Sequence, residues 1–181
     1  MSKPRLEDLV SVDIEASGPS PSTGSLISIG ACLVNDPQLG FYVEIQPMPG
    51  LPWSAAAERV HGLSQKHLAT QGQPPGDAMQ AFAQWLSENC RNRPIFAGFN
   101  APFDWMFVAD AFWRELDRNP FGISGMDMKS YALGKLQLAS WGETNKRDLR
   151  KRFPTDLIHT HNALDDAREQ AQLMRALREA R

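Results

Sequence analysis

The sequence has little cysteine and no long apolar run. Its two cysteines, Cys32 and Cys90, are too few for a disulfide framework, and both lie among apolar residues, which predicts buried, reduced thiols. No apolar run approaches the roughly 18 residues of a membrane span. The N-terminal stretch MSKPRLEDLVSVDIE also lacks the apolar core of a signal peptide. These absences exclude the disulfide-rich secreted and membrane-spanning classes and predict a cytoplasmic protein.

The sequence also lacks an excess of charge of either sign. Its 19 Lys and Arg residues against 21 Asp and Glu residues give a formal net charge of −2, so a generally basic surface is excluded. A nucleic acid must then be held by a local patch or through metal ions. The 181 residues, 42% hydrophobic and 22% charged, are typical of a globular chain. Without repeats or long linkers, residues 1–181 are expected to form a single domain.

Segments typical of strands come first in the chain, and segments typical of helices follow. Three β-rich runs, within residues 6–18, 25–34 and 41–48, predict an antiparallel meander whose second turn lies at residues 35–40. A buried strand is expected at 94–99 and a short strand or loop at 122–127. Helices are expected at 54–62, 64–69, 77–90, 100–116, from 128, at 145–153 and from 162. The predicted fold class is α/β, with a mixed central sheet flanked by helices.

Two of these helices begin with residues that favour helix starts. Asn100 is expected to cap the helix at 100–116, which places Asp104 near its first turn. Asn162 is expected to cap the last helix, so that Asp165 falls at the third helical position and reaches back to the cap. Asp166 lies beside the apolar stripe of that helix and is the better candidate for a metal ligand.

The acids of the first strand raise the question of what balances their charge. Asp13 and Glu15 are two residues apart, so in a strand both point to one face. Such pairs usually mark a solvated face, but here they interrupt an apolar run typical of a central strand, where an uncompensated pair would cost several kcal/mol. Mg²⁺ or Mn²⁺, which prefer carboxylate oxygens, would compensate the charge. Asp104 lies between two aromatic residues; it is either a first-turn acid or a third ligand.

Four motifs occur in order along the chain. They are D-x-E at Asp13 and Glu15, RVHGLS at 59–64, N-x-x-x-D from Asn100 to Asp104, and H-x-x-x-x-D from His161 to Asp166 within HNALDDA. Together, over residues 10–171, they resemble the DEDDh family of 3′→5′ exonucleases, which includes RNase T and the proofreading exonuclease subunit of bacterial DNA polymerase III. The chain departs from the common T-T-G after the first motif, where it reads ASG and continues with PSPSTGS.

The resemblance implies an RNase H-like fold and a 3′→5′ exonuclease that releases 5′-mononucleotides from single-stranded DNA or RNA. It implies two Mg²⁺ or Mn²⁺ ions roughly 4 Å apart, which activate the attacking water and stabilise the leaving oxygen. Asp13 would bridge the ions, Glu15 and Asp166 would complete their coordination, and Asp104 would hold the second ion directly or through water. His161 would be the general base.

Other residues of the pattern are assigned less directly. Asn100, Phe103 and His61 are expected to contact substrate, and His159 and His67 are expected to be loop and surface residues. The aromatic residues Phe99, Phe103 and Trp105 either stack a base or pack in the core. The basic run at 146–152 is either a solvated helix face or a patch that follows phosphates.

The sequence leaves the assembly of the protein open. Single-stranded nucleic acid is the expected partner, a homodimer is compatible with the sequence, and a segment that would tether a polymerase is not expected. The alternative function is a catalytically silent nucleic-acid-binding or scaffold protein on the same fold.

Overall fold

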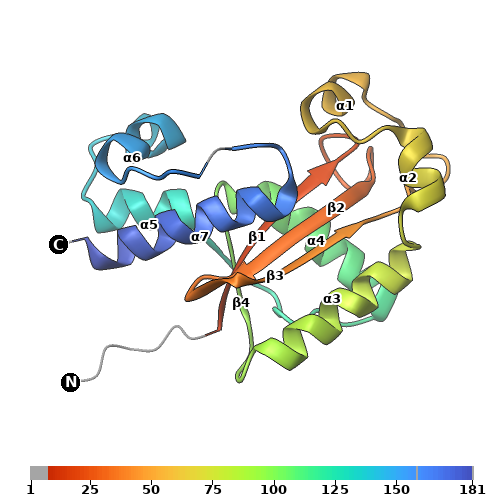
Figure 1. Cartoon of the computed structure of the whole chain (residues 1–181), viewed down its shortest axis with the longest axis horizontal. Coiled ribbons are helices and arrows are strands. Elements are labelled where there is room, and N and C mark those ends of the chain that lie inside the picture. Colours follow the sequence, from red (N-terminus) through yellow and green to blue (C-terminus); the bar gives the residue numbers. More distant parts are fainter. Residues whose placement is uncertain (1–7, 158, 181) are drawn as a thin grey trace.

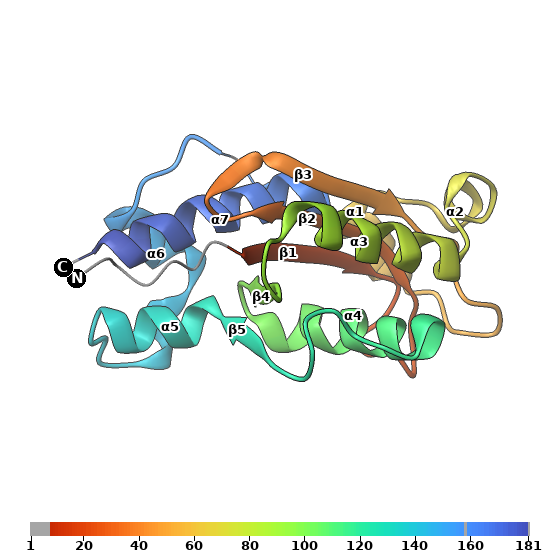
Figure 2. The same cartoon turned by 90° about the horizontal axis from the view of Figure 1, so that it is seen from below.

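A five-stranded mixed sheet forms the centre of the molecule. The computed structural model describes residues 8–157 and 159–180. The strand order is β3-β2-β1-β4-β5, in which β1 pairs antiparallel with β2, β2 antiparallel with β3, and β4 parallel with both β1 and β5 (Figures 1 and 2). The strands are β1 Leu9–Ala16, β2 Leu26–Leu33, β3 Asp36–Glu44, β4 Ile95–Gly98 and β5 Gly125–Asp127. The predicted mixed sheet with a three-stranded meander is confirmed.

Helices cover both faces of this sheet (Figure 2). Helices α3 and α4 pack against one face, α7 packs across β1 and β2 on the other, and α5 and α6 pack beside α7. The helices are α1 Ala55–His61, α2 Gln65–Gln71, α3 Pro75–Asn89, α4 Ala101–Leu116, α5 Met128–Lys135, α6 Lys146–Arg152 and α7 Ala163–Glu179, with a 3₁₀ turn at Trp141–Thr144. None of the described helices is long and apolar enough to cross a membrane.

The alternation of side chains along β1 separates the core from the site. Val10, Val12 and Ile14 are buried against α3 and α4, and each such side chain contributes about 1.5–3 kcal/mol by leaving water. The intervening positions point to the α7 face, so Asp13 and Glu15 lie on that face together. The strand is therefore fixed by its apolar half while its acids line the space beneath α7.

The turn expected at residues 35–40 was placed wrongly. Only Val34 and Asn35 separate β2 from β3, because β3 begins at Asp36. The pairing shifts from Cys32↔Gly40 to Leu33↔Asp36, so the extra residues, Pro37 among them, form a bulge in β3. Since β3 is an edge strand, Pro37 removes no central ladder hydrogen bond, and turn-favouring residues are tolerated there.

The two cysteines are free thiols that differ in exposure. Cys32 is buried in β2, as expected, whereas Cys90 at the end of α3 is only half-buried. Burial is the main cause that raises the pKa of Cys32 to about 12 and the pKa of Cys90 to about 11. Both thiols therefore stay protonated near neutral pH, which makes them poor nucleophiles.

Helix α7 approaches the sheet most closely at Gly30 of β2, which pairs with Asp13 of β1. A Cβ atom at Gly30 would lie 2.0 Å from the backbone carbon of Ala163 and 2.1 Å from the nitrogen of Leu164. Only glycine permits this contact. The first turn of α7 is thereby held directly beside Asp13.

Candidate active site

A cleft of about 210 Å³ opens over the acid-bearing part of β1. Asp13 and Glu15 line it from the sheet, and Asp104 lines it from α4. The sequence-predicted residues His161, Asn100 and Phe103 also line this cleft, together with Ile14, Phe99, Lys146, His159 and Gln170. Residues from distant motifs thus converge on one cleft, as the order of the motifs predicted.

Asp104 connects helix α4 to strand β1. Its side chain is only 5% exposed, and its Oδ1 accepts a hydrogen bond of 3.1 Å from the backbone N–H of Ile14. Because Ile14 lies between Asp13 and Glu15, this bond fixes Asp104 next to the strand acids. The carboxylate is thereby placed by the fold and is not a solvated first-turn acid.

The expected side-chain cap by Asn100 is wrong. Asn100 occupies the N-cap position with a left-handed backbone (φ 65°), but its side chain makes no cap hydrogen bond. Asp127, at the end of β5, accepts the bond from the Ala101 N–H instead, at 3.0 Å. The Asn100 side chain is therefore not engaged in the cap, and it lies at the cleft.

The start of α7 is capped as expected, but with a different second partner. Asn162 Oδ1 accepts hydrogen bonds from the N–H groups of Leu164 (3.1 Å) and Asp165 (3.3 Å). The reciprocal bond from Asp165 to the cap does not form, because the Asn162 N–H donates to the hydroxyl of Thr160 at 3.2 Å. Asp165 is exposed and lies 3.6 Å from Arg168.

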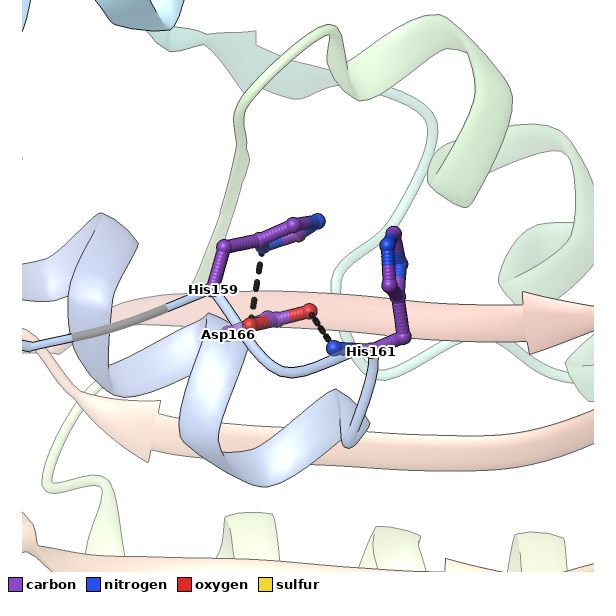
Figure 3. Close-up of side chains that lie close together, drawn as sticks. All are labelled: His159, His161 and Asp166. Atoms are coloured by element: carbon purple, nitrogen blue, oxygen red, sulfur yellow. Dashed lines mark hydrogen bonds and ion pairs between the residues drawn. The ribbon is translucent and has the colours of Figure 1, made fainter. Parts of the chain in front are cut away.

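Asp166 is fully buried, and the loop before α7 wraps around its carboxylate. Oδ1 accepts the N–H of Thr160 at 2.9 Å, and Oδ2 accepts the N–H of His161 at 3.0 Å. His159 Nδ1 lies 2.9 Å from Oδ1 (Figure 3). His161 has a left-handed backbone, with φ 58°, a conformation uncommon outside glycine that turns the loop sharply around the acid.

Three of the acids form a close group. Asp13, Glu15 and Asp166 each offer an oxygen atom within 4.8 Å of the others. Burial and the charge of Asp166 raise the pKa of Asp13 to about 7, and burial together with Asp13 and Asp166 raises the pKa of Glu15 to about 8. Burial, then Asp13, raises the pKa of Asp104 well above its ordinary value. The cleft thus holds carboxyl groups whose ionised forms are destabilised by burial and by one another, and a bound cation would stabilise them.

Gln170 orients Asp13 and was missed by the sequence analysis. Its Nε2 donates to Asp13 Oδ1 at 2.5 Å, and its Oε1 accepts the N–H of Phe99 at 2.9 Å. The amide therefore joins α7, β1 and the end of β4. Gln170 lies four residues after Asp166, one helical turn onward on the same face, and that spacing is the signal that could have identified it.

The basic run divides between the cleft and the helix surface. Lys146 lies at the cleft, where its Nζ is 3.2 Å from Glu169 and 3.2 Å from Nδ1 of His159. Arg150 also pairs with Glu169. Arg147 and Lys151 both form ion pairs with Asp148, which belongs to the same helix, α6. The position of Lys146 at the cleft is compatible with a patch that follows phosphates, whereas the pairs that Arg147 and Lys151 form with Asp148 are typical of a solvated helix face.

Of the three aromatic residues considered from the sequence, two line the cleft and one packs against the core. Phe103 lines the cleft and packs edge-on against Phe107, with ring centroids 5.3 Å apart. Phe99 also lines the cleft, and the Lys146 ammonium lies 5.4 Å from its ring centroid. Trp105 packs edge-on against the buried Phe96 at 5.2 Å, which places it with the core.

Two histidines, His61 at the end of α1 and His67 in α2, do not line the cleft. His61 is buried, its Nδ1 accepts the N–H of Leu63 at 3.0 Å, and its Nε2 has no partner among the described residues. Burial lowers the pKa of His61. His67, as expected, is a surface residue, and it pairs with Glu44.

Comparisons with known proteins identify relatives along nearly the whole chain. A family model described as exonuclease, RNase T, matches residues 10–174. The 3′-5′ DNA exonuclease Cap18 of Escherichia coli is 39% identical over 173 residues, which cover 94% of this chain and 91% of that protein. Ribonuclease T of Hahella chejuensis is 26% identical over 180 residues, which cover 91% and 80% of the two chains. The crystallographic structure of the nuclease domain of 3′hExo, a DEDDh family member bound to rAMP, matches with a TM-score of 0.77 at 12% identity, over 98% of this chain and 93% of that one.

Proposed function

This chain belongs to the DEDDh family of 3′→5′ exonucleases, and on that premise we propose that it releases 5′-mononucleotides from the 3′ end of single-stranded DNA. One observation carries the proposal. Asp13, Glu15 and Asp104 line one open cleft together with His161, and the buried Asp166 lies beside them, with a carboxylate oxygen within 4.8 Å of oxygen atoms of Asp13 and Glu15. A scaffold protein without activity has no need to hold such acids together, because each buried carboxyl group destabilises the fold unless it is compensated.

The donor set of the cleft fits hard divalent cations. Oxygen atoms of Asp13, Glu15 and Asp166 lie within 4.8 Å of one another, and carboxylates are the side chains that Mg²⁺ and Mn²⁺ prefer. We assign these three acids as the ligands, with Asp104 as the fourth. When bound, two such ions make water a better nucleophile and stabilise the leaving 3′-oxygen.

The remaining roles belong to residues that this chain provides directly. His161 is assigned as the general base, because an imidazole nitrogen can accept a proton from water and this one lies at the cleft. Asp166 keeps it in place, since its Oδ2 accepts the His161 backbone N–H at 3.0 Å. Gln170 keeps Asp13 in one orientation through the 2.5 Å bond to Oδ1.

Substrate contacts are assigned to four residues with a polar or aromatic side chain. Asn100 has no cap bond, and Phe103 presents its ring at the cleft, where it can stack a terminal base. His61 stays a predicted substrate contact: it does not line the cleft, but its buried Nε2 atom has no partner among the described residues. Lys146 would attract a phosphate of the strand.

We favour DNA over RNA because Cap18, named a DNA exonuclease, is 39% identical, whereas the ribonuclease T from Hahella chejuensis is 26% identical. A homodimer stays a prediction, which analytical ultracentrifugation of the purified chain would test. In either assembly the proposed substrate is a strand that is single near its 3′ end.

The experiment that tests this proposal compares DNA and RNA strands of equal sequence, each labelled at its 5′ end and incubated with Mg²⁺. We expect stepwise shortening that is faster for DNA, and none with the Asp13→Asn variant. Faster shortening of RNA would contradict the substrate. A wild-type protein that shortens neither strand in Mg²⁺ or Mn²⁺ would favour the catalytically silent alternative.

A further inference from the structure

Two imidazole rings flank one buried carboxylate at the start of α7 (Figure 3). The ring centroids of His159 and His161 are 4.4 Å apart, and the ring planes are inclined at 71°. One ligand atom from each histidine and one carboxylate oxygen of Asp166 lie within 4.8 Å of one another. This set of two nitrogen atoms and one oxygen atom differs from the all-oxygen set of the strand acids.

We infer that His159, His161 and Asp166 form a second metal site, which takes Zn²⁺ in preference to Mg²⁺ and whose occupation stops the nuclease reaction. The second half of this inference rests on the function proposed above. Imidazole nitrogen binds zinc and the later transition metals well, whereas Mg²⁺ prefers oxygen ligands and water. Two histidines and one carboxylate are also a recurrent zinc donor set that leaves a fourth position for water.

The geometry requires only a small adjustment of the loop. Zinc bonds to histidine nitrogen of about 2.0–2.1 Å in a tetrahedral site place neighbouring ligand atoms about 3.4 Å apart. His159 Nδ1 and Asp166 Oδ1 are 2.9 Å apart, so this pair must open by about 0.5 Å for an ion to bind between them. The His161 side chain must turn toward the pair. His161 lies in the loop before α7 and not in the helix, so this rotation does not disturb the helix.

The charge around the site is balanced rather than repulsive. The ammonium of Lys146 lies 3.2 Å from His159 Nδ1 and would by itself disfavour a cation. Glu169 offsets it, because its carboxylate lies 3.2 Å from Lys146 and 3.5 Å from His159 Nδ1. The negative charge of Asp166 then favours binding of a divalent ion.

Occupation of this site would remove two groups from the reaction. The nitrogen of His161 that binds the ion has no free electron pair with which to accept a proton from water. Asp166 belongs to both donor sets, so a zinc ion held there also competes with the ions that the strand acids hold. Zinc inhibition would therefore depend on His159, which the four exonuclease motifs do not include.

The direct test is a calorimetric titration of the full chain with Zn²⁺ in the presence of excess Mg²⁺. We expect the wild type to bind one zinc ion per chain, and the His159→Asn variant to bind it at least about 10–100-fold more weakly, since even the loss of an outer-shell partner of a ligand weakens binding that much. Asn is chosen because its amide can still donate to Asp166 Oδ1 and so keeps the loop folded. The matched control is His67→Asn, a surface histidine paired with Glu44, which should bind zinc as the wild type does.

Nuclease activity with and without zinc is then compared within each variant. Zinc should suppress the Mg²⁺-dependent activity of the wild type and of His67→Asn at a concentration that spares most of the residual activity of His159→Asn. Equal zinc binding by the wild type and His159→Asn, or equal suppression of both, would overturn the inference. Zinc binding that depends on His159 in a protein without Mg²⁺-dependent activity would support the metal site and refute the nuclease function instead.

Discussion

The contact between Gly30 and the first turn of α7 yields the sharpest structural prediction. In a Gly30→Ala variant, the new Cβ atom would lie 2.0 Å from the backbone carbon of Ala163, whereas ordinary van der Waals contacts begin at about 3.4 Å. The backbone of α7 must therefore move away from β2 by about 1.4 Å. Asp166, three residues further along the same helix, moves with it.

Two measurements follow from this shift. Overpacking of a core contact costs about 1–3 kcal/mol, so urea denaturation should show a loss of this size in the free energy of unfolding. A displacement near 1 Å of a group at the reaction centre costs about 10²-fold in rate, so kcat should fall by at least that factor under conditions where the variant is folded. Circular dichroism at the assay temperature would establish that it is folded.

The matched control is Gly134→Ala in helix α5, where the added Cβ atom would meet nothing within 4 Å. Alanine is the better helix former, so this variant should be about 0.5–1 kcal/mol more stable than the wild type and equally active. A Gly30→Ala variant with wild-type stability and turnover would refute the claim that the close contact between α7 and β2 positions Asp166 beside Asp13.

Three further outcomes are expected. Asp166→Asn should abolish most turnover, whereas Asp165→Asn should change stability by about 1 kcal/mol or less and keep turnover, and equal losses in a primer-shortening assay would contradict this division. His161→Ala should keep Mg²⁺ and single-strand binding but lose about 10²–10⁴-fold in kcat, and an unchanged rate would remove it as the base. In metal-free protein, burial raises the pKa of Asp13 to about 7 and that of Glu15 to about 8, so the folded state holds protons that the unfolded chain releases near pH 4. The free energy of unfolding should thus fall as the pH rises from about 4 to about 8, and Mg²⁺ should restore most of it at the upper end; thermal melts with EDTA or Mg²⁺ that show no such trend would contradict the buried acid pair.

The sequence was sufficient to predict the parts of the fold that depend on local periodicity. Val10, Val12 and Ile14 alternate with polar positions, and this pattern alone placed Asp13 and Glu15 on one face of a strand. The order of the other elements followed from apolar spacing in the same way. The bulge in β3 could not be predicted, because Pro37 signals a turn equally well, and only its position on an edge strand makes it compatible with a sheet.

The motifs named side chains that the fold brings close together, whereas the contacts that hold those side chains depend on tertiary structure. Asn100 has the residue type of a cap, yet Asp127 takes that role because β5 ends beside the start of α4. Gln170 and Lys146 act through side-chain contacts with residues far along the chain, and local sequence carries no signal for the partner. His159 was expected to be a loop residue, which it is, but its contact with Asp166 depends on the fold of that loop.

The most direct test of the account follows the two ends of one DNA strand. The same single strand is labelled either at its 3′ end or at its 5′ end and incubated with the protein in Mg²⁺. If the carboxylate cleft drives 3′→5′ hydrolysis, the 3′ label appears at once as a mononucleotide, the 5′ label stays on a shortening strand, and chelation of the metal or Asp13→Asn stops both changes. Release of the 5′ label first, or release of the 3′ label that continues without metal or in the Asp13→Asn variant, would contradict it.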